Sequence, residues 1–237
     1  QSRAVVLVAS RRDTNGDSGR VEMRAKFASV LLTLLSLGSA SPLFAQTILE
    51  RKILIEINRV RNDPVGYAAH LRDYRRYYDG KIITAPGMKV RYLTEEGVAP
   101  VDEAVRFLEG QRRRRPLAAA DLLRAAAIDH CAEQASDGSL GHVGADGSDP
   151  GTRVRRRGGG IYVGEVITYG SDDAADVVRQ LIVDDGVADR GHRKLVFADD
   201  IDFAGVSCGP HPAFGTMCVV DVARTVDGRA RMQFAAN

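Results

Sequence analysis

The chain has 237 residues, of which 44% are hydrophobic, enough for one sizeable core and too few for a convincing two-domain protein. Residues 46–237 hold 27 of the 33 basic and 28 of the 31 acidic residues, a net charge of −1. This near balance argues against a general nucleic-acid binder and against a protein that binds anionic membranes.

Residues 23–45 have the pattern of a secretory signal peptide, with a basic start, an apolar stretch over residues 27–37 and a Gly/Ser/Pro-containing exit. The apolar stretch is shorter than the roughly 20 residues that a membrane-spanning helix needs. We expect cleavage after Ala45, with Ala40 as the alternative, and a secreted, extracellular or periplasmic protein without a membrane span. Residues 1–22 show no clear period and are expected to be disordered or an artefact of start-site choice.

Two helices are predicted at the start of the mature chain. Thr47 and Glu50 form a capping box ahead of apolar residues at helical spacing, namely Leu49, Ile53, Ile57 and Val60. Asp63 is the expected cap of the second helix, which has Pro64 at its first position and extends to near Gly80.

The segment 81–99 contains two glycines and a proline and is predicted to be an irregular or extended insert. Further helices are expected over residues 100–111 and 117–136. Cys131 on the last of these is interpreted as a small buried residue rather than a nucleophile, because its neighbour His130, at the margin of the apolar face, points elsewhere around the helix.

The amino-acid composition of the second half of the chain differs from that of the first. The Gly, Asp, Ser and Arg content of residues 137–160 predicts a loop, followed by a strand over residues 161–169 and a helix capped by Ser171. Two β-like runs then form a hairpin that brings Cys208 and Cys218 near bridging distance, so we predict a disulfide between them.

Together these elements predict an α+β fold in which helices surround a small, mostly antiparallel sheet. Residues 46–116 form its helical N-terminal part with the insert, and residues 117–237 form the remainder of the same domain, 46–237.

Two arginine clusters are candidate ligand sites. Residues 112–115 precede Pro116, and Arg153 with residues 155–157 precedes three glycines. They are consistent with contacts to phosphates or acidic glycans. No aromatic residues interleave to stack bases, so we expect solvated side chains instead.

Four ionisable residues lie on loops and element ends of the second half: His142, Glu165, Asp184 and His192. Asp184 continues the buried stripe of the preceding helix, where a carboxylate is costly unless it is paired or coordinated. Asp185 fits that stripe as well, and both remain candidates. Two imidazoles and two carboxylates suit a divalent metal or acid–base chemistry.

A structural interpretation also remains open. The two histidines then hydrogen-bond neighbouring loops while the acids fix their tautomers. Two further histidines, His70 and His211, are expected to be surface residues.

The GH, GE and GHR segments around these residues resemble the CAP superfamily (cysteine-rich secretory proteins, antigen 5 and pathogenesis-related 1), specifically its secreted bacterial-type members. The resemblance runs from about Thr47 to Ala223. It implies an αβα sandwich with a large open cleft, floored by two histidines and two acids that bind zinc or another divalent cation in some members.

The family's site residues transfer by motif position for His142, Glu165 and His192, and for Asp184 only by its place at the end of the preceding helix. Val166 stands where the family usually has Asn, and Asp184 has a shorter reach than the more familiar Glu. Both departures weaken the expectation of metal affinity.

Two function classes follow. The first, which we favour because no GxSxG motif or serine–histidine pairing is evident, is a secreted non-enzymatic module whose cleft binds a small molecule, lipid or protein. His142 and His192 are then candidate ligands of zinc or another divalent cation, with Glu165 and Asp184 as candidate further ligands. The second is a metal-dependent hydrolase or peptidase in which the metal polarises water and Glu165 is the general base.

Overall fold

In the computed structural model, the first two helices begin where the sequence predicts. Thr47 Oγ1 accepts a hydrogen bond from Glu50 N at 3.2 Å and Glu50 Oε2 accepts one from Thr47 N at 2.8 Å, which completes the capping box of α1 (Ile48–Asn62). Asp63 caps α2 (Pro64–Arg75). The structure describes residues 46–86 and 91–231, so the predicted signal peptide and residues 1–22 lie outside the described residues.

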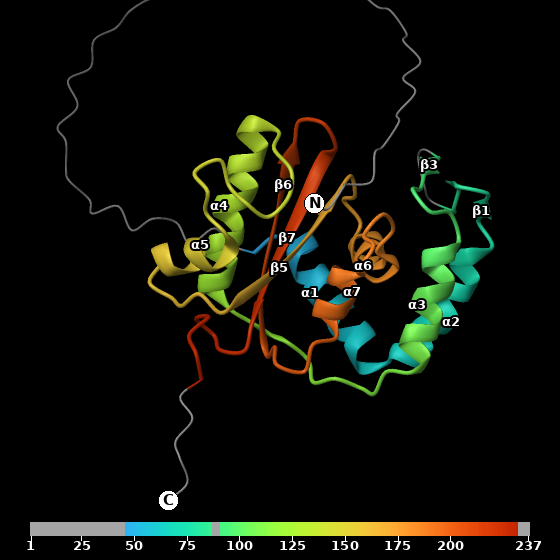
Figure 1. Ribbon diagram of the computed structural model, residues 1–237, viewed down its shortest axis with the longest axis horizontal. Helices are drawn as coiled ribbons and strands as arrows, with labels where there is room; N and C mark the ends of the chain where they lie inside the picture. Colours follow the sequence, from blue (N-terminus) through green and yellow to red (C-terminus); the bar gives the residue numbers. More distant parts are fainter. Residues whose placement is uncertain (1–45, 87–90, 232–237) are drawn as a thin grey trace, which may run out of the picture. The chain divides into compact units, whose positions relative to one another are not determined.

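The predicted insert forms a small sheet of its own. Helix α2 ends at Arg75, earlier than predicted, because the chain then pairs as strands β1 (Tyr78–Asp79), β2 (Ile82–Ile83) and β3 (Tyr92–Leu93) in antiparallel order. Helix α3 (Ala99–Glu109) follows and packs against α2 (Figure 1).

A four-stranded sheet forms the centre of the described domain, in the order β4 (Ala118–Ala119), β6 (Phe203–His211), β7 (Gly215–Ala223) and β5 (Val163–Tyr169). Among these described strands, only the short β4 pairs in parallel, with β6. The fold is therefore α+β with a mostly antiparallel sheet, as predicted.

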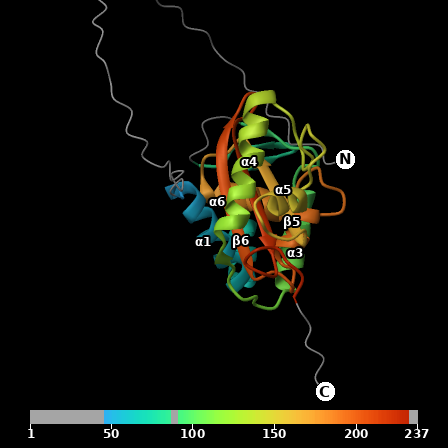
Figure 2. The ribbon, with the colours of Figure 1, turned by 90° about the vertical axis from the view of Figure 1, so that its left-hand side faces the viewer.

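Helices cover both faces of this sheet, which gives an αβα sandwich. α4 (Asp121–Asp137) lies against β6 and β7 on one face with α5 (Pro150–Arg156) beside it, and α1 and α6 (Ala174–Val183) pack on the other (Figures 1 and 2). Gly205 on β6 permits the first of these contacts, because a Cβ there would collide with the backbone of Leu123 and Arg124.

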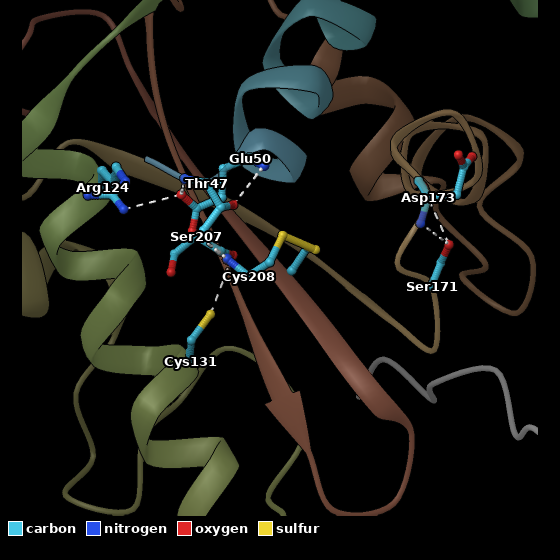
Figure 3. The surroundings of a disulfide bond; sticks show 9 residues. Thr47, Glu50, Arg124, Cys131, Ser171, Asp173, Ser207 and Cys208 are labelled. Atoms are coloured by element: carbon cyan, nitrogen blue, oxygen red, sulfur yellow. Dashed lines mark hydrogen bonds and ion pairs between the residues drawn. A yellow bond between two sulfur atoms is a disulfide. The ribbon is translucent and has the colours of Figure 1, made fainter. Parts of the chain in front are cut away.

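The predicted disulfide between Cys208 and Cys218 is confirmed, and these residues face each other across the hairpin with Cα atoms 4.1 Å apart. Figure 3 shows the bond close to the start of α1, where Glu50 Oε1 accepts a hydrogen bond from Cys208 N. Cys131 is on the face of α4 that packs against the sheet, is 4% exposed, and burial raises the pKa of its thiol to about 12. The interpretation of Cys131 as a buried apolar residue is confirmed.

Several local predictions are wrong. Residues 137–160 are not all loop, because Asp149 caps α5 by accepting a hydrogen bond from Thr152 N at 2.6 Å. Helix α4 starts at Asp121 rather than residue 117, because residues 118–119 pair with the sheet. The cap of α6 is Asp173, and Ser171 instead accepts a hydrogen bond from Asp173 N.

Three basic side chains predicted at the surface or at a margin are buried. His130 is completely buried, Arg153 is 3% exposed and His211 is 2% exposed. His211 is covered because its ring packs against Tyr169 and Phe214. His70 is exposed, as predicted.

Candidate functional site

The four predicted site residues form two histidine–carboxylate pairs. His142 Nδ1 lies 2.9 Å from Glu165 Oε1, and His192 Nδ1 lies 2.7 Å from Asp184 Oδ1. The two imidazole rings lie close to each other, with centroids 6.1 Å apart. Because an ionised carboxylate only accepts hydrogen bonds, Nδ1 is the donor in each pair, and Nε2 is the ring nitrogen that the pair does not use.

Asp184, rather than Asp185, is the acid that contacts His192. It ends α6 in the left-handed conformation, with φ of 60°, is 1% exposed, and its second carboxylate oxygen accepts a hydrogen bond from Arg193 N at 3.1 Å. His192 itself lies in α7 (Gly191–Val196), a short helix that follows α6. The Asp185 carboxylate instead accepts hydrogen bonds from backbone N–H groups of the insert.

A buried arginine, Arg153, hydrogen-bonds both residues of the His142–Glu165 pair. Arg153 on α5 donates to Glu165 Oε2 at 2.6 Å and to the backbone oxygens of His142 and Ser148 at 3.1 and 3.0 Å. A buried carboxylate needs such a partner, since desolvation of an unpaired charge is costly. Arg153 thus fixes both Glu165 and the backbone of its histidine partner.

Asp221 on β7 lies directly opposite Glu165 in the sheet and is completely buried. Burial, followed by the neighbouring charge of Glu165, raises the pKa of this carboxyl well above its ordinary value. The Glu165 pair therefore sits in a charged interior cluster in which Arg153 provides the direct counter-charge.

The loop that carries His142 is fixed by hydrogen bonds to the residue before it. Gly141 has φ of 92°, which favours glycine, and its oxygen accepts from His130 Nε2 at 2.8 Å and Gln134 Nε2 at 2.7 Å. Its N–H donates to the hydroxyl of Tyr169 at 3.0 Å. The imidazole of His142 is consequently presented from a rigid backbone rather than from a free loop.

Both rings line a pocket of about 130 Å³ beside α6. Its walls are mainly tyrosine and aliphatic side chains, and Asp184 lies at the same end as the histidines. The insert forms part of the wall through Ile83 and Tyr92, so this segment covers the cleft rather than a remote face.

The geometry bears on metal binding in two ways. Among residues 46–86 and 91–231, no group of three or more His, Cys, Asp and Glu side chains is arranged to hold a metal ion. The two imidazoles nevertheless fit as a pair of ligands, because metal-bound histidines commonly donate their other ring N–H to a carboxylate, as His142 and His192 do here.

Three sets of residues at this site are not predicted from the sequence: Arg153, Asp221 and the tyrosines near the end of α2. The sequence pattern assigns Arg153 to a solvated cluster, because the helix that buries this residue, α5, has the composition of a loop. Asp221 lies within an apolar strand, and only the register places it beside Glu165. The tyrosines at the end of α2 are evident in the sequence, but nothing local indicates that the insert folds them toward the histidines.

Comparison with known protein families gives a match over most of the domain. The family model described as "Cysteine-rich secretory protein family" (CAP) matches residues 56–222. Among solved structures, an outer surface protein from Borrelia burgdorferi is similar, with 16% identity over 46% of this chain and 77% of that chain and a TM-score of 0.38.

An extracellular protein containing a SCP domain from Bacillus anthracis str. Ames is 16% identical over 54% of this chain and 38% of that chain, with a TM-score of 0.40. A search of curated proteins gave no match. In the described part of the chain no helix is both long and apolar enough to cross a membrane. Because the family model spans well over half of the sequence, the chain belongs to the cysteine-rich secretory protein family.

Proposed function

We propose that this chain is a secreted, non-enzymatic binding domain whose pocket takes a small ligand beside the two histidine–carboxylate pairs. The observation that carries the proposal is that His142 and His192, with their Nδ1 atoms already engaged, both line one largely apolar pocket. Apolar walls with a few convergent polar groups are typical of small-molecule sites.

The same two histidines are the proposed ligands of a divalent cation such as zinc. Each would coordinate through Nε2, while Glu165 and Asp184 would orient the rings from the other side. Water or the bound molecule would complete the coordination shell, and the ion would supply a positive charge at the inner end of the pocket.

Binding is favoured over the metal-dependent hydrolase because Glu165 is not placed as a general base. One of its carboxylate oxygens contacts His142 and the other contacts Arg153, and the side chain is 1% exposed. A base that activates water must reach the reacting proton within hydrogen-bond distance.

Secretion is supported by the signal-like pattern of residues 23–45 and by the disulfide between Cys208 and Cys218, since such bonds persist in oxidising compartments.

The experiment is native mass spectrometry of the chain expressed with its N-terminal segment, collected from the medium or periplasm and titrated with Zn²⁺. We expect a product that begins after Ala45 or Ala40 and takes up one Zn²⁺. His192→Ala should lose the ion, whereas His70→Ala, which removes an exposed histidine on α2, should keep it.

Two results would count against the proposal. Uptake of Zn²⁺ that survives His192→Ala would place the metal elsewhere. Turnover of a peptide or ester library that His192→Ala abolishes would favour the hydrolase.

A further inference from the structure

The pocket beside the histidines has a second, aromatic end. Four of the seven tyrosines of the chain line the pocket. Tyr74, Tyr78 and Tyr92 form this end, whereas Tyr169 lies at the histidine end, because its hydroxyl accepts a hydrogen bond from Gly141 N. Tyr74 and Tyr78 pack edge to face with ring centroids 5.8 Å apart. Such gathered rings present electron-rich faces and apolar surface to a ligand.

This aromatic end runs along α6. Asp176, Arg179 and Gln180 line the pocket at helical spacing, and Asp184 lines it beyond the end of the helix. Eight residues at about 1.5 Å each place Asp176 about 12 Å from Asp184. The pocket is therefore long enough for a ring and a short chain that ends at the histidines.

The volume limits the occupant further. This pocket measures about 130 Å³, close to the roughly 150 Å³ of an apolar cavity that holds a molecule the size of benzene. The volume therefore limits the ligand to about one aromatic ring and a few further atoms. A sterol or a long acyl chain does not fit unless the walls move.

Charge selects the head group of the ligand. Among the described residues that line the pocket, three carry carboxylates, Asp176, Asp184 and Asp185, against one guanidinium, that of Arg179. The tyrosine cluster already attracts this cation, since Arg179 Cζ lies 4.1 Å from the centroid of the Tyr74 ring. Its charge is further engaged by an ion pair with Asp176 at 2.5 Å.

The two histidines favour the same kind of head group. With each Nδ1–H donated to a carboxylate, a neutral imidazole presents the lone pair of Nε2 to the ligand. Such an atom accepts a hydrogen bond from an ammonium or hydroxyl group and repels a carboxylate.

From the size, the rings and the charge of this pocket we propose that, in the metal-free protein, the ligand is a small arylalkyl amine, with its ring among the tyrosines and its ammonium group at the Nε2 atoms of His142 and His192. This rests on the proposed binding function without its metal, and adds the class of ligand to it.

The test compares 2-phenylethylamine, 2-phenylethanol and phenylacetate, which share a ring and a short polar extension and differ in charge. Each is titrated into the secreted, EDTA-treated protein by isothermal calorimetry, because a divalent ion would compete for the Nε2 atoms. We expect the amine to bind best and phenylacetate at least about tenfold more weakly.

Variants then locate the bound molecule. Tyr92→Leu should weaken amine binding severalfold, whereas Tyr162→Leu should not, because Tyr162 is 63% exposed and does not line the pocket. Asp184→Asn keeps a residue that tolerates the left-handed backbone and removes the charge. It should reduce the preference for the amine over the alcohol. Thermal unfolding of each variant confirms that it is folded.

Phenylacetate binding as tightly as the amine would overturn the proposal, and so would the absence of binding by all three compounds. The proposed function is judged separately, by the Zn²⁺ titration and by binding of palmitate or cholesterol in the same calorimeter. If either lipid bound while the amine did not, the ligand class would be wrong and the binding function would stand.

Discussion

Replacing Arg153 with methionine tests whether this arginine balances the buried Glu165 charge. Methionine preserves much of the length and apolar volume but removes three hydrogen bonds, to Glu165 and to the backbone oxygens of His142 and Ser148. Both members of the ion pair are buried, with side-chain exposures of 3% and 1%. Breaking such a pair from one side costs about 3–5 kcal/mol, because the other charge stays buried without a partner.

The assay is urea unfolding at neutral pH with the disulfide intact. For an m-value of about 2 kcal/mol/M, this loss lowers the midpoint by about 2 M. The control is Arg156→Met on the same helix, whose ion pair with Asp146 is half exposed on both sides, so that about 0–1 kcal/mol is expected.

A second comparison separates charge from packing. In a Glu165→Gln background, Arg153→Met should cost clearly less, because a neutral amide does not need the guanidinium. The reasoning is refuted if the single variant loses less than about 1 kcal/mol, or if its cost is the same in both backgrounds.

Three further predictions follow from the fold. Replacing Cys208 and Cys218 together with alanine should lower the free energy of unfolding by about 2–3 kcal/mol, measured in urea, since the bond closes a loop with a sequence separation of 10. Gly205→Ala should destabilise the protein by about 1–3 kcal/mol through collision with the backbone of α4. Gly209→Ala on the same strand should cost less, because its Cβ would meet Cys131 Cβ at an ordinary 3.5 Å; equal thermal shifts would contradict this. The raised pKa of Asp221 means that the folded state holds a proton that the unfolded state releases at lower pH, so stability should fall as pH rises above about 4. Asp221→Asn should flatten that pH dependence in urea titrations, and an unchanged slope would count against it.

The sequence predicts well those features that depend on local chemistry. The capping box of Thr47 and Glu50 and the Pro64 start of α2 need only neighbouring residues, and the structure has both. The hairpin brings Cys208 opposite Cys218 for the same reason, since a short loop fixes the register. The four site residues are predicted from motif resemblance, whereas their separation into two pairs is evident only in the structure.

Features that depend on distant partners could not be predicted. His211 lies between two prolines and resembles a surface turn residue, yet Tyr169 and Phe214 cover it. Arg153 belongs to a basic, glycine-flanked stretch, and its burial depends on Glu165, which follows 12 residues later in another element. Composition describes the average environment of a segment, whereas burial of one charged side chain depends on a single complementary partner.

The insert and His192 both contact the residues at the C-terminal end of α6. Asp184 at this end orients His192, while the next residue, Asp185, accepts hydrogen bonds from Glu95 N at 2.7 Å and Glu96 N at 2.9 Å in the insert. Arg190 strengthens the same junction, donating to the Asp184 backbone oxygen at 2.8 Å and pairing with Glu96. Any movement of the insert that enlarges the pocket must therefore act on the segment that positions His192. We therefore expect ligand size and the placement of the imidazole to be coupled through these two adjacent aspartates, so that a ligand that fits the tyrosine end also favours the geometry of the polar end.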